Sequence, residues 1–206
     1  MALNVQNISF KYPQGEPILD SVSLCVGDSE MLALVGPSGC GKSTLLHCIA
    51  GLIEADSGEV SIDGKAMNAV QVHQRSIGIM MQDQPLYEHL TVEKNIAFPL
   101  HARGKNVSPV AQLMEQLDLA SIANRKVSKC SGGERRRIAL ARAVVIRPKV
   151  LLLDEPLISI DPLLRETMKE FIQTIHTELK ASTIIVSHHH VEVEKMCEQL
   201  ITMEQL

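Results

Sequence analysis

The chain has few aromatic residues, no long apolar run and no paired cysteines. Phenylalanine, tyrosine and tryptophan together make up 2% of the 206 residues, so the core must be built from aliphatic side chains. No stretch approaches the roughly 18 consecutive apolar residues of a membrane-spanning helix, so any action at a membrane requires a partner. The five cysteines, at positions 25, 40, 48, 130 and 197, show neither metal-binding spacing nor a secreted disulfide framework. We therefore expect free thiols in a reducing cytosol.

The net charge and the first residues of the chain argue against a nucleic-acid-binding protein and against a secreted protein. The net charge of −4 gives no reason to expect a nucleic-acid partner. The first ten residues, MALNVQNISF, lack a basic region followed by an apolar one, so we expect no signal peptide. The length allows one or two domains with a substantial core.

Residues 31–44, MLALVGPSGCGKST, form the strongest motif. The apolar run Met31–Val35 predicts a short buried strand, three glycines turn the chain, and Lys42 opens a helical pattern. The apolar positions of that pattern are Leu45, Leu46, Ile49 and Leu52. A loop of small residues lets backbone N–H groups converge on an anion, and the helix N-terminus adds partial positive charge. In this strand–loop–helix order Lys42 would reach the outer phosphates of a nucleotide and the Ser43 hydroxyl would ligate Mg²⁺. A plain glycine turn with a coincidental Gly-Lys-Ser fits the full spacing poorly.

The residues around this motif predict several strands. Residues 3–10 alternate, with Leu3, Val5, Ile8 and Phe10 as candidates for one buried side. Leu19–Val26 reads as a second strand, and Gly27-Asp28 predicts a hairpin turn into Met31–Val35. Glu59–Ile62 predicts a strand followed by the tight hairpin signal Asp63-Gly64, and Ser76–Met81 predicts another that ends at Gln82.

A helical stretch follows over residues 91–146, with turns expected at Pro99–Gly104 and Asn106–Pro109. One helix fits the apolar positions Val110, Leu113, Met114, Leu117 and Leu119. Another fits Ser131 to about Ile146.

The last third of the chain returns to alternating strands and helices. Val150–Leu153 is a continuous aliphatic run typical of a central parallel strand, and Asp161-Pro162 predicts the start of a helix. The apolar stripe of that helix is Leu164, Met168, Phe171, Ile172, Ile175 and Leu179. Thr183–Val186 predicts a strand, followed by a short helix and a last strand near Leu200–Met203. This alternation predicts an α/β fold with a helical insert of roughly 55 residues.

Asp154 and Glu155 end the predicted strand Val150–Leu153. Ligands of α/β proteins bind at the carboxyl ends of parallel strands, and neighbouring residues point to opposite sides. Asp154 could hold Mg²⁺ and Glu155 could polarise an attacking water. Taken alone, an acidic loop after a strand explains these residues about as well.

A second motif, Ser131-Gly132-Gly133-Glu134, precedes an arginine-rich helix. Ser131 and Glu134 have the spacing of a capping box, and Arg135–Arg137 could form a solvated face. The exposed N–H groups of such a helix start could also receive a phosphate, and both interpretations can hold together.

These motifs together resemble the ATP-binding subunit of an ABC transporter, nearly from end to end. GPSGCGKST resembles Walker A, VLLLDEP resembles Walker B, and CSGGERRRIALARA resembles the signature LSGGQ with its helix. Single residues match the adenine-stacking aromatic, the Q-loop glutamine, the D-loop aspartate and the switch histidine; these are Tyr12, Gln82, Asp161 and His188. Residues 83–99, DQPLYEHLTVEKNIAFP, are similar to those of importer-type subunits.

The resemblance implies a fold and a set of contacts. The fold would be a P-loop NTPase with a RecA-like core at about 1–85 and 147–206, an N-terminal antiparallel β part, and a helical subdomain at about 86–146. ATP would bind Tyr12 and the loop residues Pro37, Ser38, Gly39, Cys40, Gly41, Lys42, Ser43 and Thr44. Mg²⁺ would be held by Ser43, Gln82 and Asp154, and Glu155 and His188 would be catalytic. In a head-to-tail dimer, a homodimer or a pair with a related subunit, each ATP would also meet Ser131, Gly132, Gly133 and Glu134 of the other copy.

The sequence departs from the family pattern at four positions. These departures are Cys130 for Leu, Glu134 for Gln, Ile158 for the D-loop Ser, and His189 for the Asp after the switch histidine. Glu134 adds negative charge near the γ-phosphate. The departures bear on turnover more than on ATP binding.

The resemblance predicts an ATPase that powers a membrane transporter, most consistent with a bacterial importer. It would be cytoplasmic and peripheral on the inner face of the membrane through a multi-span permease partner. One alternative is a soluble non-transport ABC ATPase acting as an assembly or regulatory factor, and another is a nucleotide-binding protein that barely hydrolyses ATP.

Three consecutive histidines, His188-His189-His190, also invite a metal site, but consecutive side chains diverge and no suitable ligand spacing accompanies them. We expect His188 near the γ-phosphate and the other two at the start of a solvated helix.

Overall fold

A parallel sheet and an antiparallel sheet organise the chain, which we describe from a computed structural model covering residues 3–83, 85–158, 162–188 and 190–206. The five-stranded parallel sheet has the order β6-β7-β8-β3-β9. Its strands are β3 (Met31–Val35), β6 (Ile77–Met80), β7 (Val150–Asp154), β8 (Ser182–Ser187) and β9 (Gln199–Thr202). The four-stranded sheet has the order β2-β1-β4-β5 and is antiparallel. Its strands are β1 (Leu3–Lys11), β2 (Pro17–Val26), β4 (Ser57–Ile62) and β5 (Lys65–Ala66).

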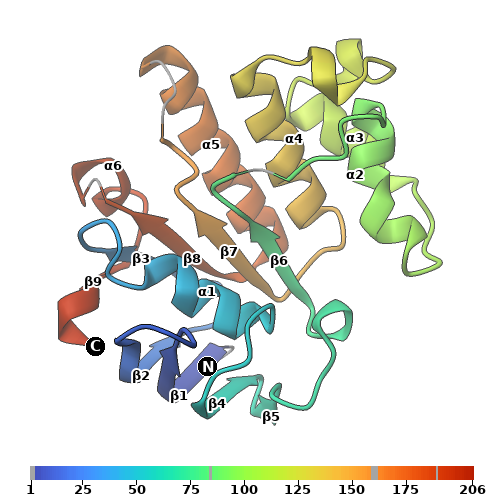
Figure 1. Cartoon of the computed structure of the whole chain (residues 1–206). Coiled ribbons are helices and arrows are strands. Elements are labelled where there is room, and N and C mark those ends of the chain that lie inside the picture. Colours follow the sequence, from blue (N-terminus) through green and yellow to red (C-terminus); the bar gives the residue numbers. More distant parts are fainter. Residues whose placement is uncertain (1–2, 84, 159–161, 189) are drawn as a thin grey trace.

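Helix α1 (Lys42–Ala50) lies between the two sheets (Figure 1). Successive strand residues face opposite sides, so Leu32 and Leu34 of β3 join α1 and the antiparallel sheet in one core. Met31, Ala33 and Val35 join the helices on the other face. All five residues of β3 are therefore buried, as expected of a central parallel strand.

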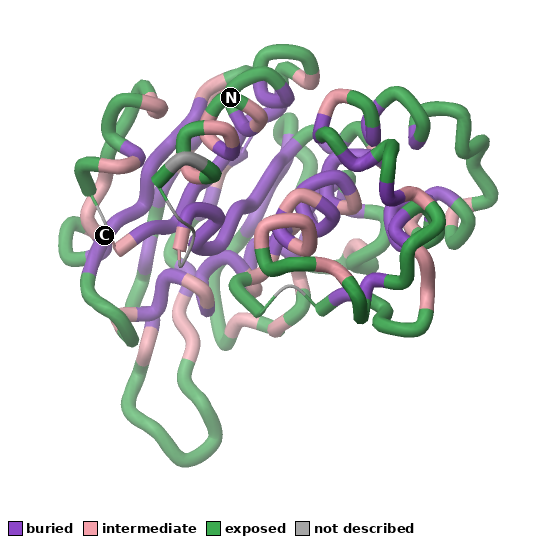
Figure 2. Tube along the Cα trace, turned by 90° about the horizontal axis from the view of Figure 1, so that it is seen from above, coloured by how far each residue is buried: buried purple, intermediate pink, exposed green. Residues whose placement is uncertain are grey.

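The remaining α-helices lie on the other side of the parallel sheet. They are α2 (Val92–His101), α3 (Pro109–Gln116), α4 (Gly132–Val144), α5 (Pro162–Leu179) and the short α6 (His190–Glu194). Of these, α4, α5 and α6 pack on the sheet, and α2 and α3 pack with α4. Figure 1 shows α2, α3 and α4 grouped beyond β6, and α5 against the sheet. The buried segments run through the middle of the molecule, and exposed loops surround them (Figure 2). Among the described residues, no helix combines the length and the apolar character needed to cross a bilayer.

The α/β fold with its antiparallel part is as predicted, but several local expectations were wrong. Gly27-Asp28 does not form a hairpin, because β2 belongs to one sheet and β3 to the other. Leu52 lies outside α1, which ends at Gly51 in the left-handed conformation (φ 76°), and it is exposed. Pro99 lies inside α2 rather than at the start of a turn, and Leu117 and Leu119 are buried just after α3 ends. Leu164, expected in the apolar stripe of α5, is 40% exposed.

Candidate functional site

The loop between β3 and α1 has the backbone that a phosphate-binding loop requires. Gly41 has φ 99° and precedes α1, and a Cβ there would lie 2.9 Å from Ile18 Cγ2 and 3.0 Å from the Ile18 carbonyl oxygen. Gly39 has φ 83°, and a Cβ there would meet nothing within 4 Å. Glycine is therefore required at position 41 for both conformation and space, and at position 39 for conformation alone. The loop therefore makes a left-handed turn directly before the first N–H groups of α1.

The Lys42 ammonium lies across this loop. Nζ donates hydrogen bonds to the carbonyl oxygens of Gly36 at 2.8 Å and Pro37 at 2.7 Å, and lies 3.7 Å from Cys40 Sγ. The side chain is 6% exposed. A buried cation whose close partners here are two neutral carbonyl groups and a thiol is suited to receive an anion such as a phosphate.

Asp154 ends β7 and carries a buried carboxylate. It is 3% exposed, and Oδ1 has no hydrogen-bond partner among the described residues. Burial raises the pKa of Asp154, while a hydrogen bond from Ser43 acts in the opposite direction. A carboxylate beside a hydroxyl is a donor set that suits Mg²⁺, and the unpartnered oxygen fits a cation. Ser43 and Asp154 therefore fit the metal site expected from the sequence.

Glu155 and His188 meet at the same edge of the sheet. Asp154 pairs with Val186 in the β7–β8 register, and the Glu155 N–H donates to the Val186 carbonyl oxygen at 3.1 Å. Glu155 then adopts φ 50°, and its Oε1 lies 2.7 Å from His188 Nδ1. Sequence reasoning placed each residue at this edge but did not predict their contact. The Glu155 carboxylate, which is 10% exposed, thus pairs with the His188 imidazole, which is 29% exposed, at the sheet edge where Asp154 lies.

Gln82 and Tyr12, two further expected residues, are both exposed. Gln82 is exposed and follows β6, the strand paired with β7, so it lies at the same sheet edge. Tyr12 is 43% exposed, and its ring meets the Phe10 ring edge-on at 4.9 Å between centroids. The expected residue Asp161, like His189, lies outside the described residues.

The second motif forms the start of α4, away from the loop after β3 (Figure 1). Ser131 Oγ accepts a hydrogen bond from the Glu134 N–H at 3.3 Å, and Glu134 Oε2 accepts one from the Ser131 N–H at 2.7 Å. The capping box expected from the spacing is therefore confirmed. Gly132 is exposed and Gly133 partly so, which leaves the helix start accessible.

The arginines after this motif are not a solvated face. Arg135 pairs with Glu88, the buried Arg136 donates to the Ile158 carbonyl oxygen, and Arg137 pairs with Asp118. Burial lowers the pKa of Arg136. Side chains of α4 thus connect to three separate segments. Arg125, which sequence reasoning missed because it belongs to no motif, pairs with Glu134 at 2.9 Å.

Comparisons with known proteins agree with this geometry. The sequence profile of the ABC transporter family matches residues 19–158. A sulfate/thiosulfate import ATP-binding protein CysA of Acinetobacter baylyi is 38% identical over 100% of this chain and 60% of its own length. The Burkholderia mallei protein of the same name is 39% identical over 98% of this chain and 60% of its own length. The chain therefore spans about 60% of the length of the curated relatives it matches.

A solved structure extends the agreement to the fold. The dimeric ATP-binding cassette MJ0796, in a post-hydrolysis state with ADP and Pi, aligns with a TM-score of 0.87 and 28% identity, covering 97% of this chain and 93% of that one. The family profile covers more than half of the 206 residues and includes the loop after β3, the α4 start and the end of β7. The chain belongs to the ABC transporter family, and its fold is that of an ABC ATPase cassette.

Proposed function

We propose that this chain hydrolyses ATP and powers a membrane transporter, working as an importer subunit through an ATP-driven head-to-tail dimer. The observation that carries the proposal is the Glu155–His188 contact at 2.7 Å beside the unpartnered Asp154 carboxylate oxygen. A carboxylate that could act as the base, an imidazole that would orient it and a carboxylate suited to a metal lie at one sheet edge, which supports phosphoryl transfer to water.

The nucleotide would be bound by the loop after β3. The N–H groups at the start of α1 would donate to the phosphates, and Lys42 Nζ would exchange its two carbonyl contacts for phosphate oxygens. Ser43, Asp154 and Gln82 would hold Mg²⁺, which offsets phosphate charge when bound. The exposed ring of Tyr12 offers a surface for the adenine.

Hydrolysis would depend on Glu155 and His188. Glu155 would accept a hydrogen bond from the attacking water and draw its proton away as the new bond forms. His188 would hold the carboxylate in place through Nδ1 and would lie beside the γ-phosphate. The positive φ of Glu155 (50°) turns its side chain away from the direction the strand would otherwise give it.

The signature residues would complete the site from the other protomer. The MJ0796 cassette is dimeric in its solved structures. In a head-to-tail dimer of this chain, Ser131, Gly132, Gly133 and Glu134 at the α4 start would face the phosphates bound by the partner. Asp161 would lie in the D-loop of the same interface.

The core would comprise about 1–85 and 147–206, and the helical subdomain about 86–146.

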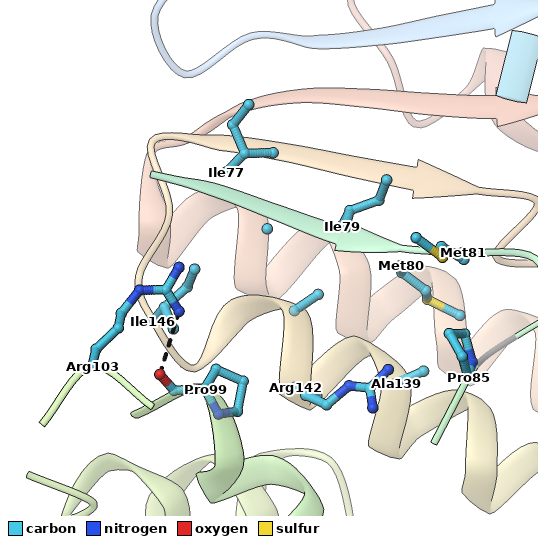
Figure 3. Close-up of a pocket in the computed structure, with 12 residues that line it drawn as sticks. Ile77, Ile79, Met80, Met81, Pro85, Pro99, Arg103, Ala139, Arg142 and Ile146 are labelled. Atoms are coloured by element: carbon cyan, nitrogen blue, oxygen red, sulfur yellow. Dashed lines mark hydrogen bonds between the residues drawn. The ribbon is translucent and has the colours of Figure 1, made fainter. Parts of the chain in front are cut away.

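A permease would dock beside β6. A cleft of about 220 Å³ lies between the edge strand β6, α2 and α4 (Figure 3). Pro85, Arg103 and Arg142 line it, and near it the rings of Tyr87 and Phe98 are 38% and 41% exposed with centroids 4.5 Å apart. The neighbouring Leu86, in contrast, is 7% exposed and packs in the core. The residues of this surface follow Gln82 closely in the sequence, so a docked permease could sense the nucleotide site. Bound to the permease, the chain would lie on the inner face of the membrane.

The direction of transport follows from the relatives. Both relatives named above are import proteins for sulfate or thiosulfate, and each matches nearly the whole of this chain. We therefore propose import rather than export.

The test replaces the catalytic carboxylate. Glu155→Gln should keep ATP binding, reduce hydrolysis to near zero and let the dimer persist with Mg-ATP on size-exclusion chromatography. Glu115→Gln, an exposed side chain on α3, is the matched control and should behave as wild type. Near-wild-type turnover in Glu155→Gln would remove Glu155 from the catalytic role.

A further inference from the structure

The carboxylate of Glu134 occupies a place where negative charge is unfavourable for the proposed function. It lies in the first turn of α4, whose N–H groups would meet the phosphates of the partner's ATP. The positive end of the helix dipole attracts a phosphate, and a carboxylate in the same turn works against that attraction. The chain must therefore offset this charge or direct it away from the phosphates.

The contacts of Glu134 show how this occurs. Oε2 accepts the hydrogen bond from the Ser131 N–H at 2.7 Å, and Oε1 accepts one from Arg125 Nη1 at 2.9 Å. Both carboxylate oxygens are thus engaged, and 19% of the side chain is exposed. The Ser131 backbone hydrogen bond lowers the pKa of Glu134, and Arg125 lowers it further, so the group is ionised at neutral pH. The charge is present, but a guanidinium offsets it.

Arg125 is held in position by a different element. Its carbonyl oxygen accepts a hydrogen bond from the Val92 N–H at 3.0 Å, at the start of α2, and its own N–H donates to the Ile122 carbonyl oxygen at 2.8 Å. The neighbouring Lys126 pairs with Thr91 in an antiparallel bridge. The backbone is therefore fixed independently of Glu134, while 42% of the Arg125 side chain is exposed. A substitution of Arg125 removes the charge without opening a cavity in the core.

We propose that Arg125 is a positioning residue of the trans nucleotide site. Its guanidinium offsets the charge of Glu134 and keeps that carboxylate in the capping box, so that the α4 start can receive the phosphates bound by the other protomer. The inference rests on the proposed function, because it requires the head-to-tail dimer. If the inference holds, Arg125 is needed for ATP-driven dimerisation only while residue 134 is an acid, and that condition is testable.

The experiment compares Arg125→Ala in two backgrounds. Each variant also carries Glu155→Gln, so that the dimer accumulates, and residue 134 is either Glu or Gln. Two quantities are measured: binding of a fluorescent ATP analogue at protein concentrations that keep the chain monomeric, and the ATP concentration for half-maximal dimerisation. Asp118→Asn is the matched control, because it removes another arginine–carboxylate pair of α4 through a side chain that is 84% exposed.

Arg125→Ala should raise the ATP concentration for half-maximal dimerisation about three- to fivefold, the upper range for a partly exposed ion pair. Monomer binding of the analogue should not change. In the Glu134→Gln background the same substitution should have no effect. Arg125→Lys should recover most of the loss, and the loss should shrink at about 1 M salt, where charges are screened within roughly 3 Å. Asp118→Asn should match its parent.

Two results would overturn the inference. An equal loss in both backgrounds would mean that Arg125 acts through the fold and not through Glu134, and an absent loss would mean that it has no role. If the parent Glu155→Gln protein binds no nucleotide or forms no dimer with ATP, the proposed function itself fails. The two failures are therefore distinguishable in one set of measurements.

Discussion

Replacing Asp154 by Asn should stabilise the protein without nucleotide and remove the stabilisation that Mg²⁺ provides. Asp154 is 3% exposed, its Oδ1 has no hydrogen-bond partner among the described residues, and burial raises its pKa above the usual 3.8. A buried charge with one unpartnered oxygen destabilises the folded state until a cation arrives. The neutral amide has the same shape and retains the neighbouring Ser43 hydroxyl as a partner.

The size of the effect follows from the cost of an unsatisfied buried group. That cost is about 1–3 kcal/mol, and the hydrogen bond from Ser43 places Asp154 toward the lower end, at about 1–2 kcal/mol. A chain of 206 residues gains about 2–4 °C in Tm per kcal/mol, so the expected rise is about 2–8 °C. Because the folded-state pKa is raised, the penalty is absent below the unfolded pKa, near 4, and develops as pH rises through the folded value. The gain should therefore be small near pH 4 and grow as pH rises through the folded-state pKa.

Thermal unfolding with no ligand, with ATP and EDTA, and with ATP and Mg²⁺ separates these contributions. Wild type should gain about 2.7 kcal/mol at a ligand concentration of about 100 times Kd, whereas Asp154→Asn should gain no more with Mg²⁺ than with EDTA. Asp118→Asn, whose carboxylate is 84% exposed, controls for loss of an aspartate. A ligand-free Tm at pH 7 equal to or below that of wild type, or an unchanged response to Mg²⁺, would refute the reasoning.

Two further predictions concern the switch histidine and the docking surface. His188→Ala should lower turnover about 10²–10³-fold while ATP still binds, since a preorganised contact to the reacting groups is lost. His190→Ala, at an exposed position of α6, should have little effect on turnover. A chelator that leaves Mg²⁺ free should not inhibit hydrolysis. Equal impairment of both variants together with inhibition by the chelator would favour the metal interpretation of the histidines. Tyr87→Cys, at the exposed edge of the cleft beside β6, should cross-link to a cytoplasmic loop of the membrane partner with which the chain purifies. An intact complex without any cross-link would count against docking there.

The carboxyl ends of the parallel strands could be predicted from the sequence because one rule governs them all. An aliphatic run followed by polar residues marks the end of a buried strand, and parallel strands end at the same edge. This places Gly36, Gln82, Asp154 and His188 together, as the sheet order confirms. The contact between Glu155 and His188 could not be read the same way, because it depends on the strand order and on the positive φ of Glu155.

The false hairpin at Gly27-Asp28 shows where turn signals mislead. The turn is real, since the Gly27 N–H donates to Glu30 Oε2 at 2.6 Å, but it carries the chain from one sheet to the other. A local signal specifies that the chain reverses and not which strand it meets next. The burial patterns of the two strands indicate that they belong to different sheets, because β2 alternates between buried and exposed residues, whereas β3 is buried throughout. A strand that is apolar throughout is typical of a parallel sheet covered on both faces, and β3 pairs in parallel with β8 and β9.

The arginines of α4 were misjudged although the required argument had been applied elsewhere in the chain. Consecutive side chains leave a helix about 100° apart, which is why three histidines in a row make a poor metal site. The same divergence forbids Arg135, Arg136 and Arg137 from sharing one solvated face on a helix packed against α2, β6 and α5. Each must meet a different neighbour, and they do so at Glu88, the Ile158 carbonyl oxygen and Asp118. The sequence thus predicts that these side chains separate, but the neighbour that each one meets depends on how the fold packs around α4.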